Sequence, residues 1–111
     1  MNNYYFGIIA EYIISFLYAM KCYSILERRY KNYLGEIDII CVRGNTLVFL
    51  EVKARSSRID DILCTPNQQR RIKNAATLFV QKNPIYKDFD LRFDLAIFRP
   101  FKWPQIIENA W

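Results

Sequence analysis

Two segments rich in β-branched and aromatic residues flank the dipeptide Gly44-Asn45, and this pattern constrains the fold more than any other part of the sequence. Both residues of the dipeptide tolerate a positive φ angle, which the two-residue loop of a β-hairpin requires. The flanking segments, residues 36–42 and 47–54, are therefore predicted to pair as an antiparallel hairpin. A longer loop over residues 43–46 would leave the same residues opposite each other.

The predicted register places two acidic side chains against each other. With this loop the cross-strand partners are Val42 and Leu47, Ile40 and Phe49, Asp38 and Glu51, and Glu36 and Lys53. Side chains alternate along a strand, so the four charged residues share one face. Like charges on directly opposed residues repel each other. The pairing of Asp38 with Glu51 therefore needs a compensating cation, either a hard divalent ion or the Lys53 ammonium group.

The length and composition indicate one small folded domain over residues 1–111. Apolar residues make up 52% of the chain and aromatic residues 16%, which excludes an intrinsically disordered protein. The 16 basic and 11 acidic residues give a net charge of +5. Such an excess favours an anionic partner, of which nucleic acid is the commonest, although it also serves solubility alone.

The sequence contains no histidine, which excludes Ser-His and Cys-His catalysis, histidine zinc sites and His-Asn-His nuclease chemistry. Its three cysteines are widely spaced and form no C-x-x-C pair. This usage predicts reduced thiols in a cytoplasmic protein rather than a zinc ribbon or a disulfide framework. Cys41 falls on the hairpin face opposite the acids and is expected in the core.

Residues 4–20 form a strongly apolar stretch that has two interpretations. No positive residue precedes the stretch and Glu11 interrupts it, so it fits poorly to a signal peptide or a membrane span. We therefore predict a buried helix and no stable membrane association. A small membrane-associated adaptor is the alternative.

The rest of the pattern predicts a second helix and two further strands. Thr65 is a natural N-cap, Pro66 suits the first helical position, and Gln68 completes a capping box with Thr65. The predicted elements are helices over residues 4–20 and from 66 to before 84, strands over 23–30, 36–42, 47–54 and 91–98, and a short terminal helix over 106–111. This order predicts an α/β fold with a central mixed sheet flanked by helices.

The order helix, three strands, helix, strand resembles the αβββαβ, restriction-endonuclease-like core of the PD-(D/E)XK nuclease superfamily, with Asp38 on the second strand and Glu51-x-Lys53 on the third. A longer set of motifs resembles the bacterial YraN-like family of uncharacterised proteins, which is described as Holliday-junction-resolvase-like. These motifs are Gly35-Glu36-Ile37-Asp38, Leu47-Val48-Phe49, Glu51-Val52-Lys53-Ala54-Arg55, Thr65-Pro66, Gln69-Arg70-Arg71-Ile72, Arg92-Phe93-Asp94 and Ile107-Glu108-Asn109-Ala110-Trp111. The resemblance covers nearly the whole chain.

The resemblance implies a nuclease-like domain that binds DNA, including branched or structured DNA, and cleaves it with Mg²⁺ or Mn²⁺. It implies that Asp38 and Glu51 are metal ligands, that Glu11 completes the metal site, and that Lys53 is the catalytic lysine. Glu36 matches the acid of the Gly-Glu-Ile-Asp motif, and the predicted register places it to attract Lys53. Two departures are Ile37, where the superfamily has proline, and Gln68, where the family has lysine.

Polar and basic residues around these motifs are predicted to contact nucleic acid through its phosphates. They are Arg55, Arg58, Gln69, Arg70, Arg71 and Lys73. Scattered surface charge is the alternative. Asp94 is interpreted as structural, as a partner of Arg92 or a cap of the sheet edge.

Three functions remain open from the sequence. The first is a divalent-metal-dependent endonuclease, in which case symmetric cleavage of a junction would require a homodimer. The second is a nucleic-acid-binding module that keeps the nuclease-like fold without catalysis, and the third is the membrane-associated adaptor. A solvated cross-strand pair of Glu51 and Lys53 would be the purely structural interpretation of the acidic face.

Overall fold

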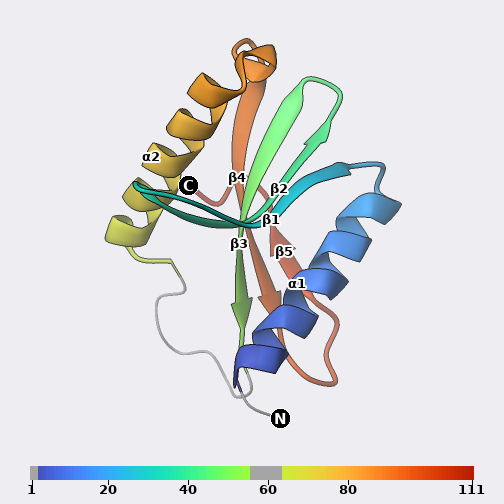
Figure 1. Cartoon of the computed structure of the whole chain (residues 1–111). Helices are drawn as coiled ribbons and strands as arrows, with labels where there is room; N and C mark the ends of the chain where they lie inside the picture. The colour runs from blue at the N-terminus through green and yellow to red at the C-terminus, as the bar shows by residue number, and fades with distance from the viewer. Residues whose placement is uncertain (1–2, 56–63) are drawn as a thin grey trace.

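A five-stranded mixed sheet separates two helices in the computed structural model, which describes residues 3–55 and 64–111 (Figure 1). The elements are α1 (Asn3–Met20), β1 (Ser24–Asn32), β2 (Gly35–Arg43), β3 (Thr46–Ala54), α2 (Pro66–Lys82), the 3₁₀ turn η1 (Pro84–Tyr86), β4 (Asp90–Phe98) and β5 (Gln105–Ile107). The strands lie in sequence order across the sheet, and only the β3–β4 pair is parallel. The predicted α/β fold, with its αβββαβ order and mixed sheet, is therefore confirmed.

The β2–β3 hairpin has the predicted register. Val42 pairs with Leu47 and Ile40 with Phe49, and Gly44 enters the turn with a φ of 59°. The ladder ends at the pair of Ile39 and Leu50, one residue before the two acids meet. The local pattern thus fixes the hairpin correctly, and the two strands separate where the charged residues begin.

The second helix packs on one face of the sheet. Its buried residues Ile72, Ala75, Ala76 and Phe79 join Leu47 and Phe49 in a core cluster. The predicted capping box is confirmed, because Thr65 Oγ1 accepts from the Gln68 amide at 3.2 Å and Gln68 Oε1 accepts from the Thr65 amide at 3.0 Å. Burial of an apolar helix stripe holds α2 on the sheet, and the cap fixes where the helix begins.

The first helix packs on the opposite face. Ile14 and Tyr18 contact a cluster that contains Cys41, Val48 and Leu50. The buried helix is therefore confirmed for one face only, since its other face leaves aromatic residues exposed. Within the part of the chain that the structure describes, no helix has the length and hydropathy needed to cross a membrane. All three cysteines are free, and Cys41 is in the core as expected.

The predicted terminal helix over residues 106–111 is wrong. Residues 105–107 form strand β5, which pairs antiparallel with Leu95, Ala96 and Ile97 of β4. A six-residue helix gains too little to offset its nucleation cost, whereas β4 offers an unpaired edge beside it. Ile106 packs against the cluster under α1, and the Trp111 ring stacks on Phe93 at a centroid distance of 5.8 Å.

Asp94 is structural, as expected. Its carboxylate is fully buried and accepts from Arg92 Nε and Nη2, both at 2.9 Å. The Tyr18 hydroxyl donates to it at 2.7 Å and the Asn109 amide at 3.0 Å. A buried carboxylate with this many donors ties α1 and the C-terminal tail to β4.

β2 approaches α2 closely at Gly35, so we predict that Gly35→Ala destabilises the fold. A Cβ atom at Gly35 would lie 2.9 Å from the Arg71 carbonyl oxygen, and the helix would have to move. The expected loss is about 1–3 kcal/mol in the free energy of unfolding, measured by urea denaturation. Gly7→Ala is the matched control, because a Cβ there meets no atom within 4 Å.

Gly7 lies inside α1, so the control substitution should stabilise the protein by up to about 1 kcal/mol through helix propensity. Equal effects of the two alanines would contradict the close packing of α2 on Gly35.

Candidate active site

Asp38 and Glu51 lie where β2 and β3 separate. The Val52 amide of β3 donates to Asp38 Oδ2 at 2.7 Å, so a side chain of β2 satisfies a backbone donor beyond the end of the ladder. The Asp38 and Glu51 carboxyl groups share a hydrogen bond. The predicted juxtaposition of the two acids is therefore present in the structure.

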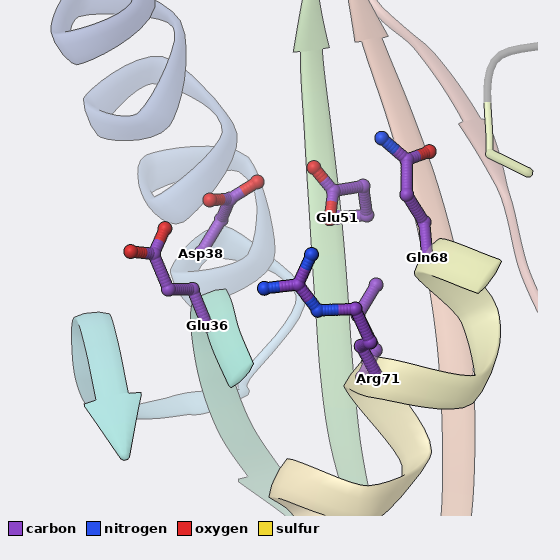
Figure 2. Close-up of a pocket in the computed structure, with 6 residues that line it drawn as sticks. Glu36, Asp38, Glu51, Gln68 and Arg71 are labelled. Carbon is purple, nitrogen blue, oxygen red and sulfur yellow. The ribbon is translucent and has the colours of Figure 1, made fainter. Parts of the chain in front are cut away.

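The two acids line a hollow of about 260 Å³ between the sheet and α2 (Figure 2). The other residues that line it are Glu36 from β2 and Gln68, Arg71 and Ile72 from α2. Figure 2 shows the Arg71 guanidinium group reaching from the helix into the space in front of the carboxylates. The hollow thus combines acidic groups on the sheet with a cation on the helix.

Burial makes the two carboxyl groups weaker acids. Desolvation raises the pKa of Asp38, and the Val52 hydrogen bond opposes that rise. Desolvation and then the charge of Asp38 raise the pKa of Glu51 to about 8, against the Lys53 ammonium group. Two adjacent carboxylates that are partly shielded from water do not both ionise readily. Without an added cation the pair therefore keeps a proton near neutral pH.

Lys53 partners Glu51. Its Nζ atom lies 3.4 Å from Glu51 Oε1, and the two side chains are only 13% and 17% exposed. Glu36 was expected to attract Lys53, and the structure shows a different partner. Glu36 Oε1 lies 3.2 Å from Lys31 Nζ, because β1 places Lys31 directly opposite Glu36.

Glu11 lines a second hollow of about 320 Å³ on the other side of Asp38. The remaining lining residues are Arg29, Tyr30, Lys31, Glu36, Ile37 and Asp38. Desolvation and the Asp38 charge raise the pKa of Glu11, and the Arg29 guanidinium group lowers it. Glu11 Oε1 lies 3.9 Å from Arg29 Nε. Glu11 is thus near enough to interact with Asp38 but is held by an arginine.

A backbone distortion in β1 brings that arginine to Glu11. Arg29 has a φ of 55°, which costs an L-residue roughly 1–2 kcal/mol. Neighbouring residues of a regular strand point to opposite faces, yet here both Arg28 and Arg29 contact α1. The Arg28 guanidinium lies 4.8 Å from the Tyr12 ring centroid, and that of Arg29 lies 5.4 Å from the Tyr4 centroid. The left-handed residue allows both contacts.

The acid pair offers two ligands for a divalent cation and does not form a closed metal site. Among residues 3–55 and 64–111, no three His, Cys, Asp or Glu side chains are gathered closely enough to hold a metal ion. Mg²⁺ commonly uses only one or two protein carboxylates and keeps several waters. Asp38 and Glu51 supply such a pair, whereas Glu11 would have to leave Arg29 to join them.

The residues predicted to contact nucleic acid are only partly brought together. Arg71 enters the hollow, while Arg70 is exposed and donates to Asn67 Oδ1. Lys73 Nζ lies over the Phe93 ring at 5.8 Å, and Gln69 donates to the Cys64 carbonyl at 3.0 Å. Arg55 Nη1 donates to the Ala54 carbonyl at 3.2 Å, and Arg58 lies outside the described residues.

Gln68 lines the hollow and was not among the predicted site residues. Two signals pointed to it: the capping box, which makes it the third residue of the helix, and its place where the family has lysine. Arg29 and Lys31 carried no signal beyond their charge, because their position depends on the irregular backbone of β1.

Comparison with known proteins finds one family and many relatives. A family model described as uncharacterised protein family UPF0102 matches residues 10–98. A UPF0102 protein from Parvibaculum lavamentivorans is 38% identical over 111 residues, covering 97% of this chain and 82% of the relative. Another, from Rhodopseudomonas palustris strain HaA2, is 42% identical over 107 residues, covering 95% and 83%. A third, from Mesorhizobium japonicum, is 36% identical over 102 residues, covering 91% and 82%.

The raised pKa of Glu51 predicts that the metal-free protein loses stability as the pH rises. The folded state binds a proton more tightly than the unfolded state, so this contribution is present below about pH 4.5 and is lost as the pH rises through about 8. Thermal unfolding in EDTA should give a Tm that falls across this range. Glu51→Gln should flatten the fall, since the amide carries no charge.

The control is Glu27→Gln, which removes an exposed acid of β1. Parallel pH profiles of Tm for the wild type and Glu51→Gln would show that ionisation of Glu51 does not destabilise the fold.

Proposed function

The chain belongs to the uncharacterised protein family UPF0102, as its resemblance to the YraN-like proteins predicted, and we propose that it is a divalent-metal-dependent endonuclease acting on structured DNA. The observation that carries the proposal is the half-buried pair of Asp38 and Glu51 with Lys53 beside it, open to a hollow that Arg71 enters. The net charge of +5 supports an anionic substrate.

Asp38 and Glu51 are the residues that would hold Mg²⁺ or Mn²⁺. When bound, such a cation lowers the pKa of its water and screens the charge that develops on a phosphate. The Val52 amide orients Asp38, and the separation of the strands leaves both carboxyl groups accessible from the hollow. Release of the shared proton would accompany binding, because a cation favours the ionised pair.

Lys53 and Arg71 supply the positive groups for the phosphate. Lys53 is held within 3.4 Å of Glu51 and is mostly shielded from water, which strengthens its interaction with an oxyanion. We assign it to the attacking water or to a phosphate oxygen. Arg71 reaches from α2 into the hollow that Asp38 and Glu51 line and would contact the DNA backbone.

A non-catalytic nucleic-acid-binding module is the second candidate. It is favoured because no three acids within the described ranges 3–55 and 64–111 are grouped closely enough to hold a metal ion together. Such a module would bind nucleic acid in a salt-dependent manner without turnover in any divalent metal.

The direct test is a metal titration with fluorescent duplex, single-stranded and four-way-junction DNA. We expect cleavage that needs Mg²⁺ or Mn²⁺ and that Asp38→Asn and Glu51→Gln each reduce by at least about 100-fold, the typical contribution of a positioned catalytic group. Asp88→Asn, which removes an exposed acid beside η1, is the control. Its rate should match that of the wild type.

Cleavage that survives EDTA, or that both acid variants retain, would overturn the proposal. Salt-sensitive binding without cleavage in either metal would establish the second candidate instead. The homodimer expected for symmetric cleavage stays a prediction, and sedimentation equilibrium of the purified protein would test it.

A further inference from the structure

The loop between β4 and β5 exposes two aromatic rings that the fold does not use. Its sequence is Arg99-Pro100-Phe101-Lys102-Trp103-Pro104. Phe101 is 106% exposed and Trp103 83%, and Phe101 is the most exposed large hydrophobic side chain in the described ranges 3–55 and 64–111. We refer to residues 99–104 as the aromatic tip.

The backbone of the tip makes Phe101 harder to explain by folding. The Lys102 amide donates to the Arg99 carbonyl at 3.4 Å, which closes a turn with Pro100 at its second position. Phe101 has a φ of 60° at the third position, where a type II turn favours glycine. Both the conformation and the hydration of the ring oppose phenylalanine here. Contact with a binding partner therefore explains the presence of phenylalanine at this position better than folding does.

The tip lies at the end of the sheet where β3, the strand that carries Glu51 and Lys53, also ends. Ala54 pairs with Phe98, and the Arg55 amide donates to the Phe98 carbonyl at 2.9 Å. Figure 1 shows the loop beyond the arrowheads of β3 and β4. At about 3.3 Å per residue, the end of β3 lies roughly 10 Å from Glu51. A bound strand of a few nucleotides would span this distance.

We propose that the aromatic tip stacks on unpaired bases, so that the preferred ligand is nucleic acid with single-stranded or unstacked nucleotides beside the acid pair. This inference rests on the proposed function and narrows its substrate class. Stacking on aromatic rings is independent of base identity, and the neighbouring Arg99 and Lys102 match an anionic backbone. Pro100 and Pro104 restrict the loop, which lowers the entropic cost of binding.

The observations favour nucleic acid over a second copy of the chain. Two aromatic side chains expose at most about 500 Å², whereas a stable interface buries about 800 Å² on each partner. A membrane surface would also accept aromatic and basic residues. The position of the tip beside the strand that carries Glu51 and Lys53 favours a ligand that extends from one to the other.

The test measures binding in EDTA, where metal-dependent cleavage does not occur. Fluorescence anisotropy is recorded with a labelled single-stranded oligonucleotide and with a blunt duplex of the same sequence. Phe101→Ala and Trp103→Ala should each raise the Kd for the single strand by about 10-fold, as loss of one stacking partner does, and should leave the duplex Kd nearly unchanged. Ile85→Ala, which removes a 76% exposed side chain from η1 before β4, should change neither Kd.

Phe101→Gly separates binding from folding. Glycine accepts the positive φ, so this variant should unfold at the same or a higher temperature while it loses single-strand affinity as Phe101→Ala does. Single-strand affinity that persists in Phe101→Gly and Trp103→Ala would overturn the inference. An affinity loss that is equal for single strand and duplex would also overturn it. So would variants that lose binding to phosphatidylserine vesicles, measured in parallel, and keep their affinity for the single strand. Cleavage activity decides the proposed function separately, because none of these readouts depends on metal.

Discussion

The partial burial of two opposed carboxyl groups is the constraint on which the rest of the site depends. Asp38 and Glu51 are half-buried where β2 and β3 separate, desolvation raises the pKa of both, and the charge of Asp38 makes Glu51 still harder to ionise. The ladder ends one residue before them, and the Val52 amide turns to the Asp38 carboxylate. This opening gives the pair access to a hollow, so the electrostatic cost of burying the acids and their availability to a ligand have the same structural origin.

The positive groups around the pair come from different elements of the fold. Lys53 lies beside Glu51 on β3, and Arg71 enters from α2. Arg29 of β1, whose own φ is left-handed, pairs with Glu11. The arrangement therefore requires α2 to pack closely at Gly35 and β1 to depart from regular geometry. Both requirements are tertiary, although the residues that meet them are visible in the sequence.

Local patterns predicted the parts of the structure that local physics controls. Gly44-Asn45 set the hairpin register, and Thr65 with Gln68 set the start of α2. The errors arose where distant elements decide. The terminal segment became β5 because β4 offered a free edge, and Glu36 paired with Lys31 because β1 lies across from it. The left-handed φ of Arg29 had no local signal, since it depends on contacts with α1.

Calorimetric titration of the metal-free protein with Mn²⁺ near pH 7, in buffers of different ionisation enthalpy, tests most directly whether the acid pair is a cation site. We expect saturable binding that releases about one proton per ion, because the ion replaces the proton shared by Asp38 and Glu51. Both the binding and the release should be lost in Glu51→Gln. The absence of saturable binding, or binding that Glu51→Gln retains with the same proton release, would contradict the account.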